Sequence, residues 1–158
     1  MFKIGDKVVY PMHGAGIIEA IEEKEVLGEK RQYYILRLPV GDMKVMIPIA
    51  NGEEVGLRGV IDREGVKKVF RILRQHSTPM SANWNRRYRA NLEKMKSGNI
   101  FEVAEVVRNL AKREREKGLS SGERKMLESA RQILVSELAL AAGLEEEKAR
   151  SLLDAAFA

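Results

Sequence analysis

One segment of the chain combines an aromatic side chain with a cluster of cations. Residues 81–92 contain the single tryptophan, Trp84, which is followed by Arg86, Arg87 and Arg89. A flat apolar ring beside guanidinium groups suits contact with a nucleic acid, because the ring can press against bases while the guanidiniums bind phosphates. The alternative is structural: Trp84 packs against a neighbouring helix, and the arginines are solvated. The segment by itself leaves both interpretations open.

The same segment is predicted to begin a helix. Asn83 is a favourable N-cap, so the helix starts near Trp84. At about 100° per residue, the next apolar side chains share the face of Trp84, whereas Arg86 and Arg89 point the opposite way. The apolar face consists of Trp84, Tyr88, Leu92 and Met95.

Side chains suited to catalysis or metal binding are few. The chain has no cysteine, and its two histidines, His13 and His76, have no histidine or cysteine partner at ligand spacing. Gly14 and Gly16 are followed by a β-rich run rather than a helix, which is not the pattern of a dinucleotide-binding loop. We therefore expect a protein that is not an enzyme and that needs no cofactor and no metal.

Charge is distributed unevenly along the chain. The net charge is +5, but residues 1–56 carry 7 Lys and Arg against 9 Asp and Glu, whereas residues 57–158 carry 21 against 14. An acidic first part joined to a basic second part suggests two different partners, and nucleic acid is the natural partner of the second.

Targeting signals and membrane spans are not predicted. The N-terminus lacks the pattern of a signal peptide, and no apolar run approaches the roughly 20 residues that a membrane span requires. We expect a cytoplasmic protein without a membrane partner. No long heptad pattern demands a dimer, so a monomer is expected.

The first fifty residues predict a small β domain. Gly14 and Gly16 are expected to form its first turn, and Pro48 places the last strand at an edge or ends it. Four or five short strands predict an antiparallel sheet curled into a Tudor/SH3-like β-barrel. The β-rich runs, bounded by turn signals, cover residues 7–10, 17–22, 33–38 and 45–49.

From residue 53 onward the apolar period becomes that of helices. Ser120 and Glu123 fit a capping box at the start of a long helix, whose apolar face is broken only at Glu137 and which ends at Gly143. About five helices are predicted in a compact all-helical domain. The fold class is α+β with segregated domains, residues 1–52 forming the β domain and residues 53–158 the helical domain.

Several blocks of the sequence together resemble the CarD/CdnL family of bacterial transcription regulators. The resemblance is carried by residues 5–14, GDKVVYPMHG, and residues 81–92, SANWNRRYRANL. Residues 104–110, 118–120 and 130–134 extend it in the same order, so that it covers essentially the whole chain.

The resemblance implies that the Tudor-like domain docks on the β subunit of RNA polymerase and that the helical domain contacts promoter DNA. It implies that Trp84 wedges into the minor groove at the upstream edge of the melted bubble and stabilises the open complex. Arg86, Arg87 and Arg89 would lie on the DNA backbone, and Lys125 is a further basic candidate. Such contacts bind DNA without sequence preference.

The resemblance also implies two polymerase-facing positions, Lys24 and Met46. Family members often carry basic side chains at both; Lys24 keeps the charge, whereas Met46 does not. An apolar or backbone-mediated interface is then expected at Met46, and the strand 44–48 could pair edge to edge with a polymerase strand or only build the domain. A protein–protein adaptor without direct DNA contact is the alternative function.

Overall fold

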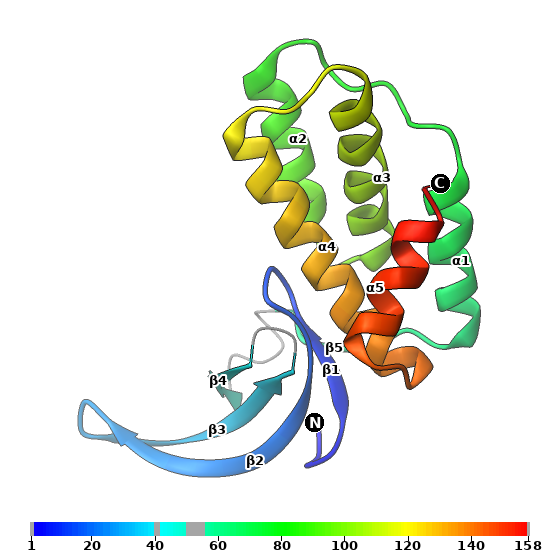
Figure 1. The fold of residues 1–158 in the computed structure, drawn as a ribbon. Helices are drawn as coiled ribbons and strands as arrows, with labels where there is room; N and C mark the ends of the chain where they lie inside the picture. Colours follow the sequence, from blue (N-terminus) through cyan, green and yellow to red (C-terminus); the bar gives the residue numbers. More distant parts are fainter. Residues whose placement is uncertain (1, 40–41, 50–55, 158) are drawn as a thin grey trace.

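The computed structural model describes residues 2–39, 42–49 and 56–157. It begins with a five-stranded antiparallel sheet in the order β4-β3-β2-β1-β5 (Figure 1). The strands are β1 (Lys7–Tyr10), β2 (Gly14–Val26), β3 (Glu29–Leu38), β4 (Met43–Pro48) and β5 (Arg58–Gly59). The helices are α1 (Arg63–Arg74), α2 (Trp84–Lys96), α3 (Ile100–Glu116), α4 (Ser121–Ala142) and α5 (Glu146–Ala155).

This architecture confirms the predicted fold class, an antiparallel β domain followed by a helical domain. The predicted boundary between residues 52 and 53 lies outside the described residues. Beyond that boundary, Arg58 and Gly59 pair with Val9 and Val8 of β1, which makes β5 a part of the sheet.

The first turn differs from the prediction. Residues 11–13 form it, while Gly14 and Gly16 belong to β2. The glycines are needed for close approach: a Cβ on Gly14 would lie 2.8 Å from the Ser136 hydroxyl, and a Cβ on Gly16 would lie 2.4 Å from the Arg37 carbonyl oxygen. Glycine at these positions therefore reflects packing against α4 and β3.

The β domain has a core on one face of its curled sheet. Strands β2 and β3 form a hairpin that extends away from the helices, and β4 lies at the open edge (Figure 1). Alternation along the strands places one set of side chains inside, in agreement with a half-buried sheet. The buried members of this cluster are Val8, Ile18, Tyr34, Leu36, Leu38 and Ile47.

The helical domain has a separate core, and its helix starts follow the predicted capping. Asn83 accepts a hydrogen bond from the Arg86 amide at the start of α2, and Ser120 accepts one from the Glu123 amide at the start of α4. Gly143 ends α4 in the left-handed conformation, at φ 67°. The starts of α2 and α4 lie together at the end of the helical domain that is remote from the sheet (Figure 1).

Candidate functional site

Trp84 is half-buried at the first position of α2. Its side chain is 43% exposed, and it is the only aromatic among the exposed large apolar side chains of the described residues. One face of the indole stacks on Tyr88, with ring centroids 5.1 Å apart and an interplanar angle of 18°. Neither of the two extremes, a core residue or a freely solvated ring, describes this position.

The start of α4 fixes the indole. Its Nε1–H donates a 2.9 Å hydrogen bond to the hydroxyl of Ser120, the N-cap of α4. The ring edge approaches Gly122, where a Cβ would lie 3.6 Å from the Trp84 ring. The ring is thus held on two sides while a large part of its surface stays open to solvent, which is the arrangement that a preorganised apolar contact requires.

Arg87 lies in a different place from the one expected for a DNA contact. Its side chain is buried, and the guanidinium donates to both carboxylate oxygens of Glu123, through Nε at 2.8 Å and Nη2 at 3.1 Å. Nη1 donates to the carbonyl oxygens of Ser81 and Ala82, just before α2. Because every donor group faces the protein interior, Arg87 serves to join α2 to α4 rather than to bind phosphate.

The pair Arg87–Glu123 shifts the titration of both groups. The hydrogen bond from Arg87 lowers the pKa of the Glu123 carboxyl, although burial opposes the shift. The same bond raises the pKa of the Arg87 guanidinium. Both groups are therefore charged at neutral pH, and the charge of Arg87 is neutralised within the protein.

The remaining basic candidates, Arg86, Arg89 and Lys125, are exposed. Arg86 and Arg89 lie on the solvent face of α2, and Lys125 lies on the solvent face near the start of α4. Within the part of the chain that the structure describes, none of the three side chains forms an ion pair. The first turn of α2 contains no acidic residue, so the positive end of its dipole adds to this cationic surface.

Residues 118–122, GLSSG, fit the Gly-x-Ser-x-Gly pattern of hydrolase nucleophiles but not its structural context. That motif requires a strand before the serine, whereas α3 precedes Ser120. The Ser120 hydroxyl contacts Trp84 and Glu123, and it caps α4. The pattern here is a helix start.

Lys24 and Met46 lie on one face of the β domain. Lys24 pairs with Arg31, and Met46 with Ile35, four positions further along the same strand. Paired residues share a face, and so do residues four apart on a strand, which places the two side chains about 13 Å apart along the sheet and about 10 Å across it. The Lys24 ammonium group forms an ion pair with Glu22 of the same strand, at 3.4 Å. Met46 is 45% exposed on the edge strand β4.

The two sets of site residues lie on separate domains. Trp84, Arg86, Arg89 and Lys125 belong to α2 and α4 of the helical domain, whereas Lys24 and Met46 lie on the sheet. Sequence reasoning missed Ser120 and Glu123 as supports of Trp84, although their capping box was a visible signal. Among the described residues, no group of three or more His, Asp or Glu side chains is placed to hold a metal ion.

None of the helices within the described ranges is long and apolar enough to cross a lipid bilayer.

Comparison with known proteins covers both domains. A family model described as the CarD C-terminal domain matches residues 68–154, and a model described as the CarD-like/TRCF RID domain matches residues 2–61. A curated protein of Bacillus subtilis (strain 168), named "Putative transcription factor YdeB", is 46% identical over 151 residues. The alignment covers 96% of this chain and 99% of that protein.

Proposed function

The chain belongs to the CarD family of transcription regulators, and from this we propose that it docks on the β subunit of RNA polymerase and stabilises the open promoter complex through non-sequence-specific DNA contact. In this proposal Trp84 is the wedge at the upstream edge of the melted bubble. Arg86, Arg89 and Lys125 bind the flanking phosphates, while Arg87 positions the wedge helix from inside the protein.

The observation that carries the proposal is the half-exposed, fixed position of Trp84. A ring that enters a distorted base step must be exposed enough to reach the bases and rigid enough to lose little entropy on binding. The contacts with Ser120 and Tyr88 supply the rigidity, and the 43% exposure leaves ring surface for the bases. The exposed cations on α2 and α4 provide affinity without reading the sequence.

The β domain supports docking through its open edge. Among the described residues, strand β4 has a neighbour, β3, on one side only, so its other side can pair with a strand of a partner. In the proposal Met46 contributes an apolar contact at this edge, and Lys24 contributes the charge. Separate surfaces on two domains fit a protein that contacts polymerase and DNA at the same time.

A crosslinking experiment tests the proposal against the adaptor alternative. The chain has no cysteine, so a photo-crosslinker can be attached to an Asn85→Cys variant beside Trp84, and to a Lys148→Cys variant on α5 as a control. In a polymerase–promoter open complex, we expect the Asn85 probe to crosslink to DNA at the upstream edge of the bubble, and the Lys148 probe not to. Crosslinks from Asn85 to protein only would instead support the adaptor.

A further inference from the structure

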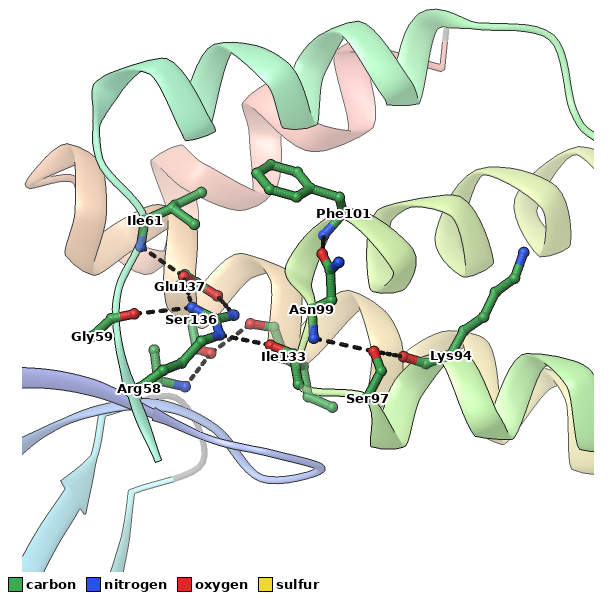
Figure 2. Close-up of polar contacts among 12 residues, drawn as sticks. Arg58, Gly59, Ile61, Lys94, Ser97, Asn99, Phe101, Ile133, Ser136 and Glu137 are labelled. Atoms are coloured by element: carbon green, nitrogen blue, oxygen red, sulfur yellow. Dashed lines mark hydrogen bonds and ion pairs between the residues drawn. The ribbon is translucent and has the colours of Figure 1, made fainter. Parts of the chain in front are cut away.

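The two domains meet at a buried carboxylate. Glu137, the residue that interrupts the apolar face of α4, is completely buried. Arg58 of β5 donates to it bidentately, with Nη1 to Oε2 and Nη2 to Oε1 both at 2.7 Å, and the Ile61 amide donates to Oε2 at 2.8 Å. Figure 2 shows Glu137 pointing from α4 towards these two residues. A strand of the β domain is thus ion-paired with the C-terminal third of a helix in the other domain.

The same arginine also reaches the start of α3. Arg58 Nε donates to the Gly98 carbonyl oxygen at 2.6 Å. Beside this bond the junction is not filled by side chains but opens as a recess of about 420 Å³, lined by Arg58, Gly59, Ile61 and residues 97–101.

Two further bonds join the β domain to α4: the Ala15 amide donates to the Ser136 hydroxyl at 2.8 Å, and Lys7 Nζ donates to the Leu140 carbonyl oxygen at 3.2 Å. The bonds of Arg58 are the ones that join the sheet to both α4 and the start of α3. Domain interfaces without large apolar contact allow relative motion unless specific bonds oppose it.

Helix α4 carries a second buried carboxylate with the same arrangement. Glu123, near the start of α4, forms an ion pair with Arg87 of α2, and Glu137 forms one with Arg58 of the β domain. At 1.5 Å per residue the two carboxylates lie about 21 Å apart along one continuous helix. The β domain and α2 are therefore each joined by an ion pair to the same helix, α4.

We propose that Arg58 and Glu137 are positioning residues, whose pair fixes the orientation of the docking domain relative to Trp84 without contacting either partner. This inference rests on the proposed function. When polymerase holds the β domain, a fixed orientation keeps Trp84 at a high effective concentration at one DNA site, whereas a loose junction spreads it over many positions. The pair thus couples the polymerase contact of the β domain to the DNA contact of Trp84.

The orientation itself can be measured without polymerase. Spin labels on Lys30→Cys and Lys148→Cys, both exposed and one on each domain, report the distribution of interdomain distances. We expect a narrow distribution in the native background and a clearly broader or displaced one with Arg58→Gln. Arg150→Gln, which removes ion pairs with Glu146 and Glu128 inside the helical domain, is the control and should leave the distribution unchanged. An unchanged distribution with Arg58→Gln would overturn the proposal.

Removing the pair should weaken stabilisation of the open complex without weakening the binding of either partner alone. For Arg58→Gln and for Glu137→Gln, each shown to be folded by circular dichroism, we expect binding to polymerase alone and to duplex DNA alone to stay within about twofold of the native protein. The concentration that gives half-maximal open-complex stabilisation should rise at least tenfold, within the range that loss of effective concentration produces. A rise below threefold would overturn the positioning role, and so would an equal loss of binary binding.

The two proposals fail separately. If the native protein stabilises open complexes and Trp84→Ala does not, but Arg58→Gln acts like the native protein, the proposed function stands and the positioning role is wrong. If the native protein has no effect on open complexes, the proposed function is wrong, and the distance measurement still decides whether Arg58 fixes the orientation.

Discussion

Arg87 and Glu123 form a buried bidentate ion pair that joins α2 to α4. Their side chains are 5% and 2% exposed, and the Nε–Oε2 distance is 2.8 Å. One residue before Arg87, Arg86 points into solvent. Two adjacent arginines in one basic cluster therefore have different roles, because one is an internal connection and the other is part of the surface.

Substitution of these two arginines should separate stability from DNA affinity. Arg87→Ala leaves the Glu123 charge buried without its partner, so we expect the free energy of unfolding to fall by about 3–5 kcal/mol. Arg86→Ala should change it by no more than about 0.5 kcal/mol. Urea unfolding followed by circular dichroism measures the free energy of unfolding of both variants. Equal, small losses in the two variants would contradict the assignment of Arg87 to the interior.

The same pair should make stability depend on pH in the acid range. The pKa of Glu123 is lower in the folded than in the unfolded protein, so the contribution of the pair is complete above the ordinary carboxyl pKa and is lost as pH falls through the folded value. The melting temperature of the native protein should therefore fall below about pH 4.5 more steeply than that of Glu123→Gln. Parallel curves would show that Glu123 titrates normally.

Arg86 and Arg89 should act through phosphates. Replacing both with alanine should reduce the slope of log Kobs against log salt concentration by about 2, since each phosphate contact contributes about 0.9. Fluorescence anisotropy with duplexes of unrelated sequence measures the slope and should show no sequence preference. Arg150→Ala, at an exposed pair on α5, is the control and should leave the slope unchanged. An unchanged slope in the double variant would exclude phosphate contact.

The edge strand offers a matched pair of methionines for testing the docking surface. Met46 and Met43 both lie on β4, and they are 45% and 48% exposed, but they are three positions apart and so belong to opposite faces. We expect Met46→Glu to weaken polymerase binding at least tenfold, because it places a charge in an apolar contact, and Met43→Glu to have a smaller effect. Immobilised polymerase in a surface-binding assay measures this. Equal effects of the two substitutions on polymerase binding would show that Met46 has no special part in docking.

Local sequence signals predicted the helix starts well. Asn83 and Ser120 cap α2 and α4 as expected, since N-capping depends on a side chain and an amide two or three residues away. The first turn was misplaced because Gly14 and Gly16 serve a contact with α4 and β3 that lies far away in the sequence. Local patterns therefore predicted the helix starts, whereas the position of the first turn depends on contacts between residues far apart in the sequence.

The burial of Arg87 could have been predicted in part from its place around the helix, although it lies in a basic segment. At about 100° per residue, Arg87 lies about 60° from Trp84 around the helix, on the side of the buried Asn91 and Met95. The helical phase therefore favoured burial, but burial of an arginine needs an acidic partner, and Glu123 lies 36 residues away in the sequence. Likewise, Glu137 stood out in an apolar face, whereas its partner Arg58 is visible only in the fold.

In the proposed function, Trp84 is a wedge that stabilises the open complex. The most direct measurement is the fraction of competitor-resistant open promoter complexes formed by the cognate polymerase without the factor, with the native protein and with Trp84→Ala, shown by circular dichroism to be folded. Trp84→Phe, which keeps a flat ring but loses the bond to Ser120, is a further comparison. We predict that the native protein raises the fraction, that Trp84→Ala does not, and that Trp84→Phe is intermediate. An equal rise with native protein and Trp84→Ala would contradict the claim.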